Sequence, residues 1–189
     1  MMTYDQRARL RVAVIGPTDI AVTSRAAGLD PDLCRQAAGL AGTELARRGC
    51  TMVLVPDRGV ALVAAEAYRR AGGPHLVGIV PRGGTSTQQA TSCCEEHRSL
   101  CDEVIEDLTW SEQHERICQL ADVMLCIGLS CGTIAEVAWT KWTGQHPVIV
   151  VRSLVSGIPP EVLAEIDVRW VEDLDEALSE IDALADRPC

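Results

Sequence analysis

The residues with the clearest potential for chemistry lie in the stretch GLSCGTIAE, residues 128–136. Glycines allow the backbone to come close to an anion, and the N–H groups at the start of a helix are unpaired and positively polarised. Ser130 and Thr133 add hydroxyl donors. Glu136 lies about one helical turn further on, so its carboxylate can point back towards the same place. The pattern fits either a structural turn between a buried strand and a helix or an anion site with an acid attached.

Two other polar stretches, residues 16–19 (GPTD) and 56–59 (PDRG), also follow apolar runs. Ligands of open α/β sheets bind beyond the carboxyl ends of the strands, so we expect these stretches near residues 128–133. The first turn is not GxGxxG and Lys141 is the only lysine, which excludes a dinucleotide fingerprint and a Walker loop. The candidate phosphate- or nucleotide-binding residues are Gly16, Thr18, Arg58, Gly59, Gly128, Ser130, Cys131, Gly132 and Thr133.

The elements that must position these residues alternate along the chain. Strand-like and helical patterns recur at roughly 25-residue spacing, which is typical of βαβ units on a parallel sheet. The expected strands are 10–15, 51–55, 76–80, 102–105, 123–127, 148–151 and 168–171. The expected helices are one from Pro31 to a stop signal at 47–49, then 59–71, one from a capping box at 109–112 to 120, 133–142, 159–166 and 174–184.

The predicted fold class is therefore α/β: a Rossmann-like three-layer sandwich with a mostly parallel sheet and helices on both faces. We expect a single domain over residues 1–189, with tails at 1–9 and 185–189. Residues 82–100 read as one long polar loop.

Composition restricts the partners. The formal net charge is −10 with a single lysine, which disfavours nucleic acid, because phosphate backbones are bound by clustered Lys and Arg. No run approaches transmembrane length and no apolar signal segment is apparent, so we expect a cytoplasmic protein with reduced cysteines and no membrane partner. A small anion held by one or two local arginines remains compatible with this charge.

Residues 115–139 (ERICQLADVMLCIGLSCGTIAEVAW) resemble the LOG-like family, long labelled "lysine decarboxylase-like". Its signature joins an Arg-bearing helix, an Ala-Asp pair, an apolar strand and Pro-Gly-Gly-x-Gly-Thr-x-x-Glu. Molybdenum-cofactor carrier proteins share a looser version. Further matches are the first strand at 12–16, the Gly-Gly…Gly-Ile-Val-Pro of residues 72–81 and the Trp…Gly…His-Pro of 142–147, so the resemblance covers residues 11–151.

The resemblance implies a nucleoside 5′-monophosphate phosphoribohydrolase, which releases a free base and ribose 5-phosphate. It implies that Gly132 and Thr133 hold the phosphate and that Glu136 serves the oxocarbenium-like ribosyl centre. Arg116 would be the catalytic arginine, whose charged fork can hold phosphate or the departing base. A homodimer or higher homo-oligomer is also implied. We expect no cofactor. A pyridoxal enzyme needs a Schiff-base lysine, and the single lysine, Lys141, is on the far side of the helix start.

Departures from the family pattern leave a second function open. Leu129 stands where the family has a glycine, residues 56–59 hold one glycine, and Asp57 adds negative charge beside Arg58. The intact Arg116 and Glu136 favour the hydrolase. The lost glycines favour a non-catalytic nucleotide or molybdenum-cofactor carrier or sensor that uses the same cradle.

Other residue patterns favour ordinary structural roles. Cys93, His97 and Cys101 would form a zinc-binding face if helical, but the segment reads as a loop without CxxC, so no metal site is expected. Cys131 is either a reactive thiol at a helix N-terminus or, as we favour, a small filler residue. Trp139 and Trp142 share a helix face and fit core or subunit contacts better than base stacking.

Overall fold

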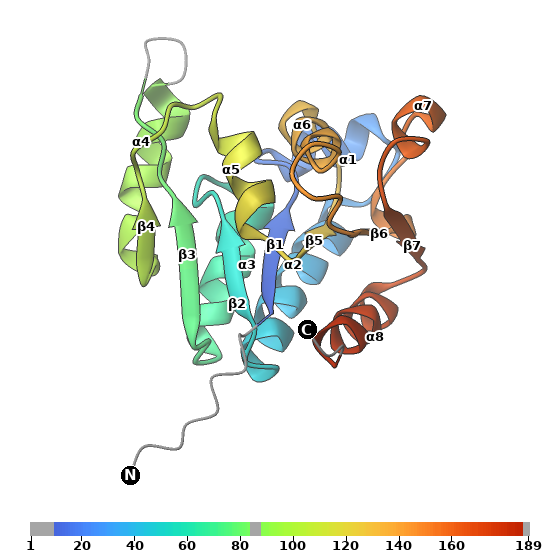
Figure 1. Ribbon diagram of the computed structural model, residues 1–189, viewed down its shortest axis with the longest axis horizontal. Coiled ribbons are helices and arrows are strands. Elements are labelled where there is room, and N and C mark those ends of the chain that lie inside the picture. The colour runs from blue at the N-terminus through green and yellow to red at the C-terminus, as the bar shows by residue number, and fades with distance from the viewer. Residues whose placement is uncertain (1–9, 84–87, 187–189) are drawn as a thin grey trace.

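A parallel sheet organises the protein. The computed structural model describes residues 10–83 and 88–186, and its strands run in the order β4-β3-β2-β1-β5-β6-β7 (Figure 1). All of the pairings between neighbouring strands are parallel. The strands are β1 (Arg11–Ile15), β2 (Thr51–Leu54), β3 (His75–Ile79), β4 (Glu103–Ile105), β5 (Val123–Cys126), β6 (Val148–Val151) and β7 (Val168–Val171). The predicted fold class is confirmed.

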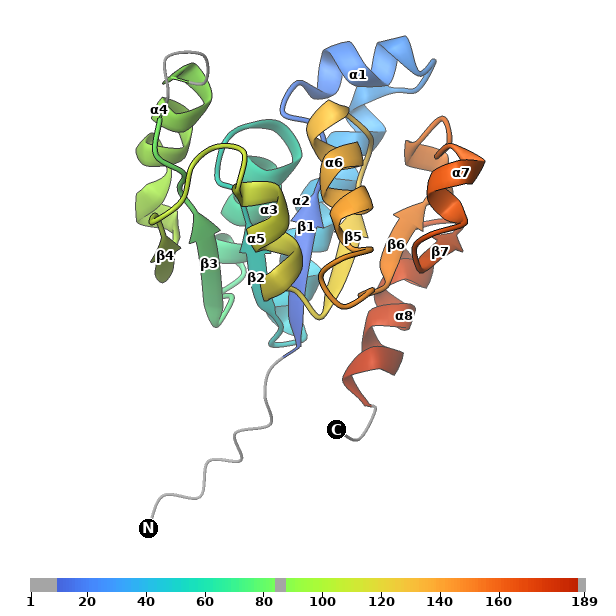
Figure 2. The ribbon, with the colours of Figure 1, turned by 45° about the horizontal axis from the view of Figure 1, so that its top comes forward.

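Helices cover both faces of this sheet (Figure 2). They are α1 (Ile20–Ala26), α2 (Pro31–Arg47), α3 (Gly59–Arg70), α4 (Gln88–Glu96), α5 (Gln113–Leu120), α6 (Cys131–Trp139), α7 (Pro160–Leu163) and α8 (Leu174–Ala185), with short 3-10 turns η1 (Arg98–Leu100) and η2 (Arg152–Leu154). None of the helices in the described part of the chain is long and apolar enough to cross a membrane.

Side chains alternate between the two faces of each strand, and this alternation divides the core. Val12 and Val14 of β1 pack with residues of α2, α3 and α8 on one face. Ala13 and Ile15 pack with residues of α5, α6 and α7 on the other face. Both faces of the central strands are buried, which explains why the strands read as continuous apolar runs rather than as alternating ones.

Two helices were not predicted from the sequence, and one began later than expected. The expected loop at 82–100 contains α4 and η1, and α1 lies in a stretch that carried no helical prediction. The Glu112 carboxylate does accept from the N–H and hydroxyl of Thr109, as the capping box requires, but α5 begins only at Gln113. The predicted tail at 1–9 lies outside the described residues, as do residues 187–189 of the predicted tail at 185–189, whereas Ala185 still belongs to α8.

A glycine sets the distance between α2 and α3. A Cβ at Gly42 would overlap the backbone carbonyl of Ala64 and lie 3.0 Å from the N of Tyr68. These atoms belong to the backbone of α3 and cannot rotate away. On the same helix, a Cβ at Gly39 would make only an ordinary contact, 3.8 Å from a methyl group of Val63.

We therefore predict opposite effects of one substitution at two positions of α2. Gly42→Ala should lower the free energy of unfolding by about 1–3 kcal/mol, because the helices must move apart. Gly39→Ala should raise it by about 0.5–1 kcal/mol, because alanine loses less backbone entropy in a helix. Thermal and urea unfolding of both variants would measure this. Equal effects would show that the close approach at Gly42 does not limit the packing.

Candidate functional site

The candidate site lies where the strand order changes direction. The chain builds β2, β3 and β4 on one side of β1 and then returns to place β5 on its other side. In parallel sheets such a reversal leaves a crevice beyond the carboxyl ends of the strands, where ligands bind. The loops after β1, β2 and β5 meet at this edge, as predicted.

The loop after β5 ends in an open helix N-terminus. Ser130 caps α6: its hydroxyl accepts from the N–H of Thr133 at 3.2 Å and lies 2.9 Å from the Thr133 hydroxyl. Within the described residues, the N–H groups of Cys131 and Gly132 have no acceptor. A Cβ at Gly132 would meet nothing closer than 3.8 Å, so the backbone here is accessible. Two free donors at a positively polarised helix end have the geometry and the charge that favour an anion.

The other predicted glycines hold the loops together. Gly59 has φ +62°, and a Cβ there would lie 2.6 Å from the carbonyl oxygen of Thr18. A Cβ at Gly16 would overlap the carbonyl of Ile127. Gly128, with φ +87°, packs against the Pro17 ring. At each of the three positions the space that glycine leaves free is filled by protein, so these residues shape the site through packing.

A small cavity of about 70 Å³ lies between these loops and α5. It contains predicted residues from all three loops together with side chains of α5 and of the turn before it. Its polar or aromatic lining side chains are Thr18, Asp57, Arg58, Trp110, Gln113, His114, Ser130, Thr133 and Glu136.

Glu136 is a buried carboxylate on the cavity wall, with 9% of its surface exposed. Burial raises its pKa, because the ionised form loses its hydration, and His114 opposes that rise. His114 Nδ1 lies 3.8 Å from Glu136 Oε1, which is an ion-pair distance but too long for a hydrogen bond. The two groups therefore face each other with their hydrogen-bonding capacity unused.

A further α5 group in the cavity lacks a partner. Gln113 is 2% exposed, yet its Oε1 has no hydrogen-bond partner in the described part of the chain, and the same holds for His114 Nδ1. Buried polar atoms are nearly always paired, because leaving one unpaired costs about 1–3 kcal/mol. Unpaired buried polar atoms around a cavity are expected where a ligand completes the hydrogen bonds.

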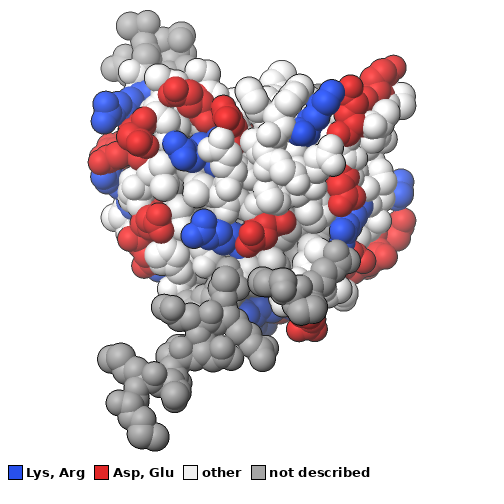
Figure 3. Space-filling model, in the orientation of Figure 1, with Lys and Arg blue, Asp and Glu red and all other residues white. Residues whose placement is uncertain are grey.

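The β2 end supplies one acid and one base. Asp57 is 3% exposed and burial raises its pKa, while Arg58, whose Nε lies 3.2 Å from Asp57 Oδ1, opposes that rise. The Arg58 side chain is half-exposed and has donors left for a ligand. On the face shown in Figure 3, basic side chains lie singly among acidic ones.

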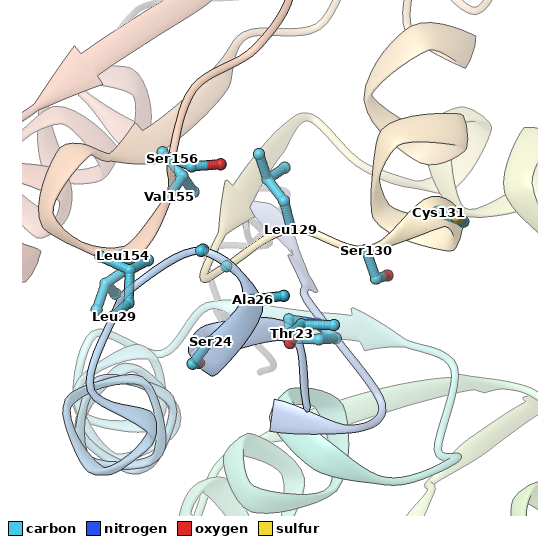
Figure 4. Close-up of a pocket in the computed structure, with 13 residues that line it drawn as sticks. Thr23, Ser24, Ala26, Leu29, Leu129, Ser130, Cys131, Leu154, Val155 and Ser156 are labelled. Atoms are coloured by element: carbon cyan, nitrogen blue, oxygen red, sulfur yellow. The ribbon is translucent and has the colours of Figure 1, made fainter. Parts of the chain in front are cut away.

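A larger cavity, of about 340 Å³, lies on the other side of the same loop (Figure 4). Residues of α1, of the loop between β5 and α6, and of the η2 region surround it. Gly128, Ser130 and Cys131 line it, and Ser130 also lines the smaller cavity. The cradle at the start of α6 thus separates two cavities.

The structure does not bring Arg116 to Glu136. Arg116 lines a separate hollow on the outer side of α5, together with Glu112, Glu115 and Asp107. His114 is the α5 side chain that faces Glu136. The buried pair Ile117 and Cys118 could have revealed this, because residues four positions earlier on a helix share its face, and those are Gln113 and His114.

The cysteines within the described residues and the two tryptophans considered from the sequence, Trp139 and Trp142, lie outside the smaller cavity. The eight cysteines within the described residues are free thiols, and no three His, Cys, Asp or Glu side chains there could hold a metal ion. Cys131 is exposed. Trp139 and Trp142 contact each other edge to face, with ring centroids 5.4 Å apart, and Trp142 is 64% exposed. Trp110, which was not predicted, is the tryptophan at the cavity.

Comparisons with known proteins agree with this architecture. Residues 9–178 match the model of the SLOG cluster4 family. A molybdenum cofactor carrier protein from Chlamydomonas reinhardtii superposes with a TM-score of 0.70 at 19% identity, covering 95% of this chain and 99% of that one. A molybdenum cofactor binding protein from Rippkaea orientalis superposes with a TM-score of 0.68 at 17% identity, covering 94% of this chain and 98% of that one.

A more distant likeness is DNA processing protein A from Helicobacter pylori, with a TM-score of 0.62 at 16% identity, covering 92% of this chain and 80% of that one. No curated protein sequence matches the chain. At these identities the structural likenesses establish the fold.

The buried carboxylate leads to a pH-dependent prediction. Below its ordinary pKa of 4.5, Glu136 is protonated in both the folded and unfolded states and costs nothing. As the pH rises, the unfolded chain ionises first, so the free energy of unfolding falls until the raised pKa of the folded state is passed. Glu136→Gln should therefore be more stable than the parent near pH 7, and this gain should disappear below pH 4.5.

Thermal unfolding across this pH range would measure the difference, and each kcal/mol should shift the Tm by about 2–4 °C in a domain of this size. Glu161→Gln, at an exposed position of α7, is the matched control and should stay within about 0.5 kcal/mol at every pH. A gain independent of pH would contradict the burial argument.

Proposed function

Because the chain belongs to the SLOG cluster4 family, we propose that it binds a nucleotide in the cavity at the start of α6 and hydrolyses its N-glycosidic bond, releasing a free base and ribose 5-phosphate. The observation that carries this proposal is the buried Glu136 facing His114 beside an open helix N-terminus. A site that only bound phosphate would gain nothing from a buried carboxylate next to it, since like charges repel.

In this proposal the phosphate lies at the start of α6. The N–H groups of Cys131 and Gly132 donate to it, and the hydroxyls of Ser130 and Thr133 are within the same turn. Arg58 supplies the positive charge from the loop after β2. These donors come from two loops that the glycine contacts hold rigidly, which favours binding because little entropy is lost.

The ribose would lie at the mouth of the small cavity, with its C1′ directed towards Glu136. A water molecule adds to C1′ while the C1′–N bond breaks and its electron pair moves to the base. Glu136, as a carboxylate, accepts a proton from the water, and protonated His114 donates a proton to the departing nitrogen. A pKa raised towards the working pH makes a carboxylate a better general base, and the carboxylate also stabilises the positive charge that develops on the sugar.

The base would leave past Trp110 and Gln113. The half-buried Trp110 ring offers a stacking face, and the unpaired Oε1 of Gln113 accepts from an amino or ring N–H group. Arg116 lies outside this cavity, so its proposed catalytic role requires a homo-oligomer or a movement of α5. We place the activity in the cytoplasm, where the free thiols stay reduced.

Base release from a panel of nucleoside 5′-monophosphates, followed by chromatography, tests the activity. Glu136→Gln and His114→Gln should each lower kcat by about 10²–10⁴, the usual contribution of a positioned acid or base. Glu115→Gln is the matched control for the acid, because Glu115 is on the outer side of α5. Arg116→Ala in the same assay tests the role that the family resemblance assigns to it.

The cradle leads to a separate prediction about binding. Ser130→Ala removes the α6 cap and one phosphate donor. It should raise the KM for the nucleotide about tenfold, or the Kd about tenfold if there is no turnover. Thr140→Val should leave both constants unchanged. Thr140 is a suitable control because it lies at the opposite end of α6 from Ser130. Its buried hydroxyl donates to the Val137 carbonyl. Inorganic phosphate should compete with the nucleotide.

A second function is favoured by two observations: Leu129 stands at a family glycine, and Arg116 lies outside the cavity. It is a carrier or sensor that holds a nucleotide or the molybdenum cofactor without turnover. This function predicts that a nucleotide at 100 times its Kd raises the free energy of unfolding by about 2.7 kcal/mol. The gain would be seen as a higher Tm, without any base release. Base release that disappears in both Glu136→Gln and His114→Gln would exclude it.

A further inference from the structure

The small cavity cannot enclose a whole nucleotide. Its volume is about 70 Å³, whereas one water molecule takes about 30 Å³ of liquid and pockets for drug-sized ligands measure about 300–1,000 Å³. Most of the ligand must therefore lie beyond it. The larger cavity, at about 340 Å³, falls within the range for such ligands.

The two cavities adjoin at the phosphate donors. Cys131 lines the larger cavity, Gly132 lines the smaller one, and Ser130 lines both. The two free N–H groups of α6 thus lie between the cavities. A phosphorus atom bound there would have space on two sides, and its substituents could extend into both.

The larger cavity suits an uncharged group. Among the described residues that line it there is no Asp, Glu, Lys, Arg or His. Its apolar wall is formed by Leu29, Leu129, Leu154 and Val155, and the hydroxyl-bearing residues Thr23, Ser24 and Ser156 also line it (Figure 4). Apolar walls with a few placed hydroxyls bind flat or apolar groups and orient them.

Charge around the cradle selects between kinds of phosphate. The small cavity holds two buried carboxylates, Asp57 and Glu136, against one guanidinium, Arg58. A phosphomonoester carries about −1.5 to −2 charge near pH 7, because its second pKa is about 6, while a phosphodiester carries a single charge. The diester is therefore repelled less, and it has the second substituent that the larger cavity can hold.

We propose that the preferred ligand is a nucleotide whose phosphate carries a second, uncharged organic group, that the cradle holds the phosphate between the cavities, and that the larger cavity binds this group. The inference rests on the proposed nucleotide site and specifies its ligand class. This proposal also explains Leu129. At a position where the family has a glycine, this chain has a side chain that forms part of the wall of the larger cavity.

Calorimetric titration with three related probes tests this proposal: the nucleoside 5′-monophosphate that binds or reacts best, its methyl phosphate ester and its phenyl phosphate ester. The methyl ester has the single charge without a group large enough to fill the cavity. We expect the phenyl ester to bind at least tenfold more tightly than the monoester, with the methyl ester between them.

Two variants of α1 locate the bound group. Ala26→Phe fills the larger cavity from an exposed position, so it should remove the phenyl ester's advantage and leave the methyl ester and the monoester unchanged. Ala21→Phe, on the same helix but outside the cavity lining, should keep the advantage. Thermal unfolding of both variants confirms that each is folded.

The outcomes separate this proposal from the proposed function. Equal affinity for the phenyl ester and the monoester overturns the second subsite but leaves the nucleotide site standing. A phenyl advantage that survives Ala26→Phe also overturns it, because the group would then bind elsewhere. If none of the three probes binds and no base is released, the nucleotide site itself is refuted.

Discussion

The close contact between three loops around the end of β1 is the constraint on which the rest of the site depends. Because the strand order reverses at β1, the loops after β1, β2 and β5 must share one small volume. They fit only where side chains are missing: Gly16 lies against the Ile127 carbonyl and Gly59 against the loop after β1. The backbone N–H of Val60 donates to the carbonyl of Pro17 and joins two of these loops directly. The cradle at α6 is therefore held by a rigid support.

Several groups around the small cavity lower the stability of the fold. The atoms Gln113 Oε1 and His114 Nδ1 are buried without a hydrogen-bond partner in the described part of the chain. The carboxylates of Glu136 and Asp57 are buried beside His114 and Arg58, respectively. An ordinary core avoids such groups, because burial of an unpaired polar atom or charge lowers stability. All of these groups line one cavity, as is typical of a site where stability is lost for binding or chemistry.

The sequence predicted the fold well because its signals are local. Apolar β-branched runs mark the strands, and the Asp30-Pro31 cap marks α2. Membership of the LOG-like group, inferred from Gly-Thr-x-x-Glu, is confirmed by the family match. α4 was missed because its sequence, QQATSCCEE, is mostly polar and was read as a loop, and α1 because its one clear signal is the Asp19 cap. The side chain opposite Glu136 was missed because the resemblance pointed to Arg116, whereas the phase of α5 is set by which residues pack on the sheet.

That phase decides which chemistry the site can support. If α5 were rotated so that Arg116 took the place of His114, a permanently charged guanidinium would face Glu136. It would lower the pKa of that carboxyl and keep it ionised. The observed phase places His114 there instead, with its Nδ1 3.8 Å from Glu136 Oε1, and both side chains line the small cavity. The same phase places Arg116 in an acidic outer hollow, and Arg58 is the arginine among the described residues that line the small cavity. One guanidinium beside two carboxylates compensates a dianionic phosphate less well than a singly charged one, and this difference is the basis of the proposed preference for a phosphodiester.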